Sequence, residues 1–467
     1  MAFGQGKKGW ENRFWDCYSC GIGGVTLHPY LRNPKSKTQK GNVSLVMVAI
    51  QIDDVFLACL TVIWVMLLYH VILCYGGYRY SVRMEQEIAQ MAELSSENLP
   101  QVTVLIPAHN EALVIDRTLR AVACMDYPEK KLTVLCLNDN STDGTGEIAR
   151  KTAASLGAHV QVVDVPPSRG GRGKSAVLNY GLEIAQGEVL AVYDADNTPE
   201  RSALLYLVHN LVKREDLGAV IGKFRTRNRY VNLLTRFINL ETIFFQWSTQ
   251  AGRWHLYSLA TIPGTNFVVW KELVQRIGGW DEKALTEDTE LSIRIYLQNQ
   301  FIKMVPYSVT WEEEPSSWKV WFKQRTRWAR GNLYVLKKYF FPLLLRGKWR
   351  LFLDMFYLMG VYFLFLSSVS ISLLIFIAGS LGVTYVSLQG PFNFLWVLAA
   401  LLFVVELGIS LTAEPGEDRG KNLLVGFLMY FSYTQMWLLV MFNAVWQGIA
   451  SYFQNEKTFW HKTERTG

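Results

Sequence analysis

Apolar runs long enough to cross a bilayer lie at both ends of a chain whose middle is polar. The first run occupies residues 43–78, and its cleanest part, about Val55 to Gly76, has roughly the 20 residues that a bilayer core requires. Three more follow at Leu351 to Leu388, Pro391 to Ala413 and Leu423 to Phe453. Buried core helices are the alternative, but repeated runs after a polar middle favour membrane helices. We therefore predict an integral membrane protein.

Two arginines directly behind the first run orient the polar middle. Arg79 and Arg83 follow that run, and positive residues beside a span favour the cytoplasmic side. The net charge of +7 also suits a position close to anionic lipid. We therefore expect a multi-pass protein of the cell membrane with its polar domain in the cytosol.

The chain then divides into six parts, of which the first and last are tails. Residues 1–42 are expected to be cytosolic or interfacial, and residues 454–467 could form a gating segment. The four parts between them are a transmembrane region at 43–78, a cytosolic domain at 99–313, interfacial amphipathic helices at 314–350 and a transmembrane bundle at 351–453.

The polar middle alternates β-branched runs with amphipathic segments. "VTVLIPAHNEA" predicts a strand that ends near Pro107 and a helix from Leu113 to Met125, and a second strand is expected from Leu132 to Leu137. Further strands are expected at Val160 to Val163 and Val189 to Tyr193. This alternation predicts a parallel, doubly wound α/β sheet, in which ligands bind at the carboxyl ends of the strands.

Acidic residues follow the second and the fourth of these strands. Asp139 follows one strand, and the triplet "DAD", with Asp194 and Asp196, follows the other. Two carboxylates at a strand end can hold Mg²⁺ or Mn²⁺, which completes its shell with phosphate oxygens and water. A helix cap before Pro199 is the alternative for this triplet alone. The acids therefore predict a donor that carries a nucleoside diphosphate or triphosphate.

Three more acids lie in the first turn of a helix expected from "LTEDTELSIRI". They are Glu287, Asp288 and Glu290, and Thr286 can cap the helix. Acids at this position also stabilise a helix through its dipole, so compensation of the dipole is the simpler interpretation of this stretch alone.

The stretch "KQRTRWARG", Lys323 to Gly331, concentrates cations around one tryptophan. A diphosphate leaving group needs positive charge where the bond breaks, and Arg325, Arg327 and Arg330 could supply it. Trp328 offers a flat face for stacking on a sugar ring. An amphipathic helix on anionic lipid is an alternative that is compatible with this role, and the many acids of the middle domain argue against nucleic acid.

Four motifs occur in a fixed order between the membrane runs: "NDNSTDGT", "DAD", "TED" and "QRTRW". In this order they resemble the processive family 2 glycosyltransferases, such as the bacterial cellulose, hyaluronan, chitin and poly-N-acetylglucosamine synthases. The resemblance covers about Leu99 to Gly331 by motif and the remainder by topology. It implies a GT-A-type fold, the α/β fold of nucleotide-diphospho-sugar transferases, inserted as a cytosolic domain between transmembrane helices.

The resemblance also implies roles for the acids. Asp139 and Asp194 match residues that contact the nucleotide, and Asp196 matches the ligand of Mg²⁺ or Mn²⁺. Asp288 matches the general base that deprotonates the acceptor hydroxyl, and its neighbour Glu287 is expected to bind substrate.

Further substrate-binding residues are implied on the donor side. His109, Asn110 and Glu111 match a loop near the base and the ribose of the nucleotide. Lys174 and Asn179 match a pair on the donor side of the site.

The Q-x-x-R-W motif is implied to serve both substrates. Arg327 is expected to point toward the diphosphate, and Gln324 and Trp328 to surround the acceptor sugar. The stretch "PGTNF", 263–267, matches a loop that lines the acceptor site.

The C-terminal "FWHKTERTG" loosely resembles a segment that covers the donor in cellulose synthase, which would make Trp460, Lys462, Thr463 and Arg465 donor contacts. Such a tail must be cytosolic, so an even number of spans must follow the catalytic domain. Three apolar runs are visible there. Either the run Leu351 to Leu388 crosses twice, or one run is interfacial, or the tail lies outside.

The implied reaction is a single inverting displacement, in which an α-linked UDP-sugar gives a β-linked product. The acceptor would be a growing glycan that the protein exports as an extracellular polysaccharide. Transfer of one sugar to a lipid carrier is the alternative. UDP-glucose and UDP-N-acetylglucosamine are both candidate donors, and the linkage stays open. Membrane lipids and accessory export or modifying subunits are further candidate partners.

Overall fold

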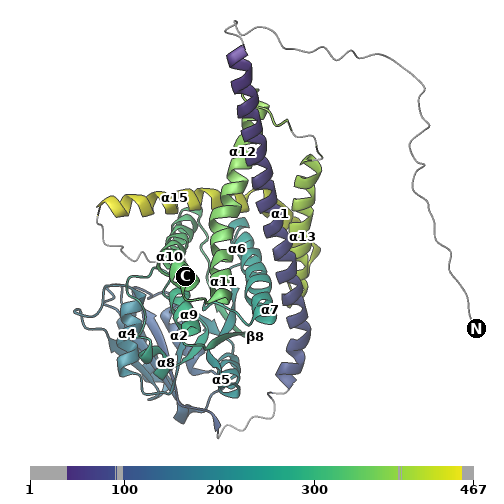
Figure 1. Cartoon of the computed structure of the whole chain (residues 1–467). Helices are drawn as coiled ribbons and strands as arrows, with labels where there is room; N and C mark the ends of the chain where they lie inside the picture. The colour runs from purple at the N-terminus through teal and green to yellow at the C-terminus, as the bar shows by residue number, and fades with distance from the viewer. Residues whose placement is uncertain (1–38, 90, 92–97, 388–389, 391, 455–467) are drawn as a thin grey trace, which may run out of the picture.

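The computed structural model describes residues 39–454, except 90, 92–97, 388–389 and 391. A mixed eight-stranded sheet, with helices packed on its faces, lies at one end of the molecule. A long first helix, α1 (Gln39–Ala89), runs past this sheet domain and continues well beyond it beside other helices (Figure 1). The expected order of apolar helix, α/β domain and apolar helices is therefore present in the fold.

Four strands form the parallel half of the sheet, in the order β3-β2-β1-β4. The apolar residues of β1, β2 and β4 are buried on both faces because helices cover both sides of the sheet, which is why these three strands have continuous apolar sequences. Strand β3 lies at the edge and is only partly buried. The predicted doubly wound arrangement is confirmed for this half. The elements are β1 (Val102–Ala108), α2 (Ile115–Ala123), β2 (Leu132–Asn138), α3 (Thr145–Leu156), β3 (Val160–Asp164), α4 (Lys174–Ile184) and β4 (Val189–Val192).

The other half of the sheet is mixed and was not predicted. Strand β7 (Phe267–Trp270) is antiparallel to both β4 and β6 (Leu217–Thr226), and β8 (Phe301–Glu312) is parallel to β6. The short β5 (Thr198–Pro199) is an antiparallel edge strand on β8. The expectation of a parallel sheet is therefore wrong for this half, because β7 enters the sheet from a long helical excursion and runs against its neighbours.

The helical stretch between β6 and β7 packs against the apolar helices. Helix α6 (Leu233–Phe244) continues through a π-helical stretch, Phe245–Gly252, into α7 (Arg253–Tyr257). The remaining elements are α5 (Ala203–Lys213), α8 (Lys271–Arg276), α9 (Glu287–Leu297) and the long α10 (Trp318–Leu345), which carries the Q-x-x-R-W motif.

Helix α1 packs directly on the π-helical stretch through glycines. A Cβ atom at Gly77 would lie 2.1 Å from the carbonyl oxygen of Trp247, and one at Gly252 would lie 2.2 Å from that of Leu73. Larger residues would push the two helices apart, so these glycines fix how closely the first helix approaches the α/β domain.

Among the described residues, four helical segments are long and apolar enough to cross a membrane: Ile52–Ala89, Phe363–Ser380, Phe394–Thr412 and Gly420–Ala450. The second belongs to one helical run, in which α11 (Trp349–Met359) leads through a π-helical stretch into α12 (Leu366–Ser380). The alternative that this apolar run crosses twice is therefore wrong.

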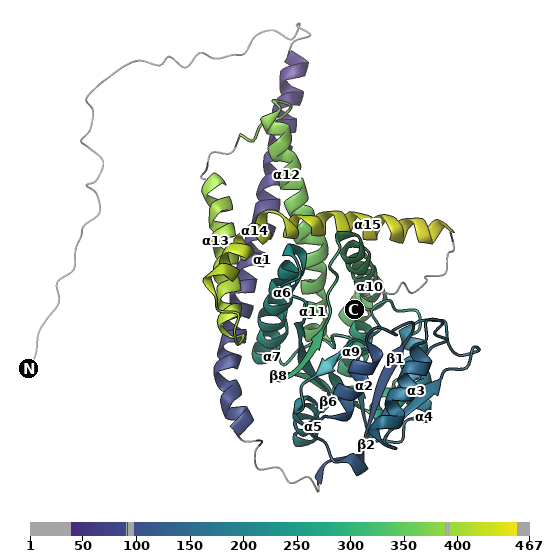
Figure 2. The same ribbon diagram turned by 180° about the vertical axis from the view of Figure 1, so that it is seen from behind.

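The last apolar run is bent. It forms α14 (Gly420–Phe431) and α15 (Tyr433–Gln454), and the backbone breaks at Ser432, with φ −128° and ψ −74°. Helices α1, α12 and α13 (Phe392–Thr412) run alongside one another, whereas α15 lies across them (Figures 1 and 2). Helices of similar apolar composition therefore run in two different directions in this fold.

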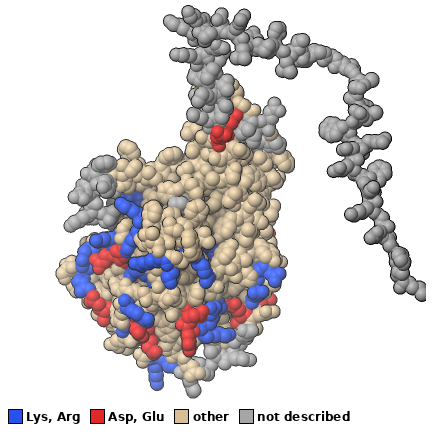
Figure 3. Space-filling model, in the orientation of Figure 1, with Lys and Arg blue, Asp and Glu red and all other residues tan. Residues whose placement is uncertain are grey.

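Charged side chains divide the surface in the same way. Lysines, arginines and acids cover the α/β domain, and the surface around the apolar helices is almost free of charge on the face that Figure 3 shows. A bilayer around the uncharged part would place α15 near the boundary between the two zones.

The loop between α13 and α14 docks on the sheet through a buried cluster of charges. The Glu414 carboxylate accepts hydrogen bonds from Lys223 Nζ at 2.7 and 2.9 Å and from Trp247 Nε1 at 2.9 Å, and it pairs with Arg225 at 3.0 Å. The Lys223 and Glu414 side chains are 5% and 1% exposed. Burial lowers the pKa of Lys223, and Glu414 opposes this effect. The loop is therefore held on the same side of the apolar helices as the sheet.

Removal of the charge of Glu414 should destabilise the protein. In Glu414→Gln the buried Lys223 loses its counter-charge, and breaking a buried pair of this kind costs about 3 to 5 kcal/mol. We expect a clearly lower melting temperature for the purified protein in detergent. The matched control is Asp126→Asn, which removes the charge of an exposed pair with Arg201 and should cost less than about 1 kcal/mol. Equal melting temperatures for the two variants would contradict the prediction.

Candidate active site

A cleft of about 370 Å³ opens where the carboxyl ends of β1, β2 and β4 meet the helices α6, α9 and α10. The predicted residues that line it are His109, Glu111, Asp139, Lys174, Asp194, Asp196, Glu287, Asp288, Gln324, Arg327 and Trp328. Residues from six separate stretches of the chain, 109–111, 139, 174, 194–196, 287–288 and 324–328, are thus brought to one cavity. Asn110 and Asn179 are not among its lining residues.

The ends of β1 and β2 hold His109 and Asp139 together. His109 Nδ1 lies 2.6 Å from the backbone oxygen of Asp139, and the Asp139 carboxylate accepts hydrogen bonds from Gly171 N at 2.7 Å and Asn140 Nδ2 at 3.0 Å. Asn110 has the left-handed φ of 56° and hydrogen-bonds with His109 Nε2 at 3.1 Å. Asn110 therefore supports the histidine from outside the cleft.

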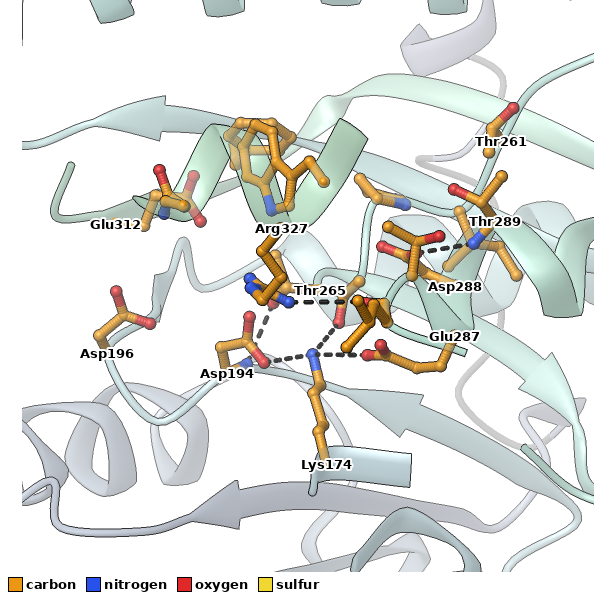
Figure 4. A pocket seen from close by; sticks show the side chains of 18 of the residues that line it. Lys174, Asp194, Asp196, Thr261, Thr265, Glu287, Asp288, Thr289, Glu312 and Arg327 are labelled. Carbon is orange, nitrogen blue, oxygen red and sulfur yellow. Dashed lines mark hydrogen bonds and ion pairs between the residues drawn. The ribbon is translucent and has the colours of Figure 1, made fainter. Parts of the chain in front are cut away.

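Lys174 is the centre of the charged part of the cleft (Figure 4). It begins α4, and its Nζ lies 2.5 Å from Asp194, 3.6 Å from Glu287 and 2.8 Å from the backbone oxygen of Gly264. Burial alone would lower the pKa of Lys174, but Asp194, Glu287 and then Asp288 raise it above its ordinary value. One ammonium group therefore links the end of β4, the start of α9 and the "PGTNF" loop.

Asn179 has a different place from the one that the resemblance implied. Its amide donates to the backbone oxygen of Trp280 at 2.9 Å, and its oxygen accepts from Trp280 N at 2.7 Å. It therefore fixes the loop before α9 and does not join Lys174 in the cleft.

Asp194 and Asp196 suit a hard metal ion that takes only part of its shell from protein. Both line the cleft from one loop, and Asp196 is buried while Asp194 is half-buried (Figure 4). Within residues 39–454 as described, no three or more His, Cys, Asp or Glu residues are grouped so as to hold a metal. Mg²⁺ and Mn²⁺ accept one or two carboxylates and complete their shell with water and phosphate oxygens, so the oxygen donors present fit such an ion.

The three acids at the start of α9 have three different surroundings. Glu287 pairs with Lys174, and the buried Glu290 accepts hydrogen bonds from Tyr339 at 2.5 Å and Lys338 at 2.7 Å of α10. Asp288 lies in the cleft, and its Oδ1 accepts from Thr289 N at 2.7 Å. Dipole compensation thus does not account for the group as a whole, because two of the three acids line the cleft.

The affinity of Asp288 for a proton is strongly changed by its surroundings. Burial and the neighbouring Glu287 raise its pKa from 3.8 to about 7, although Lys174 and Arg327 oppose the shift. Gly264, with φ of +88°, brings its backbone so near that a Cβ atom there would lie 2.9 Å from Asp288 Oδ2. A carboxylate with a pKa near neutrality in a cleft has the property that a general base requires.

Of the three arginines in "KQRTRWARG", Arg325 and Arg327 line the cleft, and Arg327 is the one turned toward Asp194 (Figure 4). It hydrogen-bonds to the backbone oxygen of Leu285 at 3.3 Å and extends toward Asp194 (Figure 4). Arg325 pairs with Glu241 at 2.8 Å, and Arg330 hydrogen-bonds to Gln447 of α15 at 3.1 Å. The expectation that all three arginines face a diphosphate is therefore wrong for Arg325 and Arg330, which hold helices together.

Sequence reasoning missed the cleft residues that come from α6 and α15. Glu241 and Trp437 line the cleft and hydrogen-bond to each other at 2.8 Å, although 196 residues separate them. Neither belongs to a motif, and α15 was expected to lie within a span. Only the three-dimensional arrangement brings these two residues to the site.

Comparisons with known proteins identify the family of the chain. Residues 100–331 match the family model described as glycosyltransferase like family 2. The probable glycosyltransferase YdaM of Bacillus subtilis (strain 168) is 44% identical over 413 residues, which cover 88% of this chain and 98% of that protein. The poly-β-1,6-N-acetyl-D-glucosamine synthase of Staphylococcus epidermidis is 26% identical over 340 residues, 72% of this chain and 80% of that protein.

A solved structure shares the fold. The mannosyltransferase PcManGT from Pyrobaculum calidifontis, in complex with GDP-Man and Mn²⁺, aligns with a TM-score of 0.51 and 19% identity and covers 84% of this chain and 100% of that chain. At this identity the likeness concerns the fold.

The raised pKa of Asp288 predicts a pH dependence of stability. The folded protein holds this proton up to about pH 7, whereas the unfolded chain releases it near pH 3.8. The stabilisation is therefore complete at low pH and is lost as the pH rises through about 7. Asp288→Asn stays neutral, so its melting temperature should exceed that of the wild type by a margin that grows from about pH 5 to about pH 8. A margin that shrinks or stays constant would contradict the assignment, and Asp126→Asn should show no such trend.

Proposed function

Because the chain belongs to the family 2 glycosyltransferases, we propose that it polymerises a UDP-sugar into a β-linked extracellular polysaccharide. It has the GT-A-type fold of that family and is a glycosyltransferase. The observation that carries the proposal is the convergence of Asp288, Lys174, Asp194, Arg327 and Trp328 on one cleft. The similarity to poly-β-1,6-N-acetyl-D-glucosamine synthases supports UDP-N-acetylglucosamine over UDP-glucose as the donor.

In the proposed reaction Asp288 accepts the proton of the acceptor hydroxyl. The hydroxyl oxygen forms a bond to the anomeric carbon as the bond from that carbon to the diphosphate breaks, and UDP leaves. Attack from the opposite face inverts the configuration, so an α-linked donor gives a β-linked product. Lys174 and Arg327 provide positive charge beside the diphosphate, where negative charge develops. Trp328 and Gln324 surround the acceptor sugar.

Asp196, together with Asp194, would hold a Mg²⁺ or Mn²⁺ ion. The ion would neutralise part of the charge of the diphosphate when donor binds. His109, Glu111 and Asp139 would contact the nucleotide, and Glu287 would keep Lys174 in place. The solved mannosyltransferase with GDP-Man and Mn²⁺ supports a nucleotide-sugar and a divalent ion as the ligands of such a fold.

We place the α/β domain in the cytosol, as Arg79 and Arg83 favour. Helix α12 would then cross outward and α13 would return, since the loop that contains Glu414 is bound to the sheet. Helix α15 would lie at the membrane surface, so that two spans follow the domain and the C-terminus is cytosolic. Residues Trp460, Lys462, Thr463 and Arg465 lie outside the described part of the chain, and their role as donor contacts stays a prediction.

Transfer of one sugar to a lipid carrier is a second candidate, and the position of α15 favours it. This helix lies across the membrane side of the cleft and contributes Trp437 to its lining. A polymer would have to pass this helix, whereas a lipid carrier could approach from the side. Membrane lipids and accessory export or modifying subunits are candidate partners under either proposal.

A donor screen tests the proposed reaction. The full chain in lipid nanodiscs would receive UDP-N-acetylglucosamine or UDP-glucose, and both released UDP and product size would be measured. We expect long β-linked polymer from one donor and a loss of about a hundredfold or more in Asp288→Asn, with UDP binding retained. A lipid-extractable product of fixed size would contradict polymerisation and support the transfer of one sugar to a lipid carrier. Full activity of Asp288→Asn would contradict the assignment of Asp288 as the general base.

Removal of divalent cations should stop transfer. We expect EDTA to abolish UDP release and added Mn²⁺ or Mg²⁺ to restore it. Asp196→Asn should raise the ion concentration needed for half-maximal rate by about tenfold or more, because one carboxylate ligand is lost. Asp126→Asn serves as the control and should behave as the wild type. Undiminished transfer in EDTA would contradict the metal site.

A further inference from the structure

One carboxylate on α6 joins three helices at the membrane side of the cleft. The Oε2 atom of Glu241 accepts hydrogen bonds from Arg325 Nη2 of α10 at 2.8 Å and from the hydroxyl of Tyr433 of α15 at 2.7 Å. Its Oε1 atom accepts from Trp437 Nε1, also of α15, at 2.8 Å. The proposed mechanism gives none of these contacts a role.

Arg325 extends this constraint to the tryptophan of the Q-x-x-R-W motif. Its guanidinium carbon lies 4.0 Å from the centre of the Trp328 ring, and its Nη1 donates to Gln324 Oε1 at 2.8 Å. The Arg325 side chain is 1% exposed. A cation buried to this extent requires a counter-charge, and Glu241 provides it. The orientation of Trp328 and Gln324 therefore depends on Glu241.

The groups that Glu241 orients form the helical end of the cleft. Gln324, Trp328 and Trp437 all line the cavity, and they come from α10 and α15. Asp139 and Asp194, at the other end, follow strands of the parallel half of the sheet. Aromatic faces bind the apolar faces of sugar rings, and indole N–H groups need a hydrogen-bond partner when they are buried. Two tryptophans on different helices can thus form two walls of one sugar site.

We propose that Glu241 is a positioning residue that holds Trp328 and Trp437 as walls of the acceptor subsite, which takes the end of a β-linked glycan. This inference rests on the proposed function, since it takes the acceptor to be a sugar. The two oxygens of Glu241 already accept three hydrogen bonds from protein groups. We therefore expect Glu241 to act on the acceptor through the two tryptophans that it positions. Its loss should weaken acceptor binding and leave the donor end unchanged.

The test separates the acceptor from the donor. Binding of a β-1,6-linked N-acetylglucosamine tetrasaccharide would be measured by calorimetry on the full chain in nanodiscs, in the presence of UDP. Glu241→Gln keeps the shape of the side chain and removes its charge, and we expect the Kd for the tetrasaccharide to rise about tenfold. The Kd for UDP alone should change by less than about twofold. Glu272→Gln, the same substitution at an exposed pair with Arg276, should change neither value.

A second variant preserves the buried ion pair and so protects the fold. Trp437→Phe removes only the indole N–H and part of the ring, and we expect the tetrasaccharide Kd to rise about threefold. If Glu241→Gln does not fold, this variant alone decides. A tetrasaccharide Kd equal to that of the wild type in a folded variant, or an equal loss of UDP binding, would overturn the role of Glu241.

Failure of this inference can be told apart from failure of the proposed function. A wild type that binds the tetrasaccharide but transfers nothing from any UDP-sugar contradicts the proposed reaction alone. A wild type that makes polymer, with Glu241→Gln unaffected, contradicts only the positioning role. A wild type that binds no tetrasaccharide contradicts the subsite and, with it, this inference.

Discussion

The buried pair of Lys223 and Glu414 joins the sheet to the apolar helices, and the arrangement of the last two helices depends on it. Both side chains are nearly inaccessible to water, so the charge of Lys223 is stable there because Glu414 is present. Lys223 belongs to β6, a central strand, whereas Glu414 belongs to the loop after α13. Helix α14 starts directly behind this loop. The contact of this loop with the sheet therefore fixes where α14 starts. Through α14 it also fixes the course of α15 and the position of Trp437 in the cleft.

A second arrangement of charges organises the cleft itself. Asp194, Glu287 and Asp288 would repel one another strongly if all three were ionised at close range, and Lys174 is the cation that lies among them. The balance remains incomplete, because one of the three, Asp288, retains its proton up to about pH 7. A donor diphosphate would bring further negative charge, and Arg327 and a divalent ion would compensate it. The same distribution of charge therefore accounts both for the stability of the cleft and for its fitness to bind a donor.

The sequence alone was sufficient to predict the features that depend on local patterns of residues. Continuous apolar strands predicted the parallel half of the sheet, and the acids behind those strands, Asp139, Asp194 and Asp196, do line one cleft. Features that depend on distant partners could not be predicted. Nothing near Arg325 shows that its partner is Glu241, and nothing near Glu414 shows that it pairs with Lys223. The break at Ser432 has no glycine or proline beside it, and apolar composition is the same for a helix that crosses a membrane and for one that lies along its surface.

The seam between α10 and α15 matters for the choice between a polymer and a lipid-linked product, because hydrogen bonds cross it at several points. Thr326 hydrogen-bonds to Asn443, Arg330 to Gln447 and Trp321 to Tyr433. Side chains of this kind would be costly to separate if nothing replaced their hydrogen bonds, but sugar hydroxyls can replace them, since they both donate and accept. An apolar seam would offer a glycan no such exchange. The position of α15 alone favours a lipid carrier, whereas the chemistry of its inner face suits a glycan chain that passes along it, and for this reason we give the polymerase precedence.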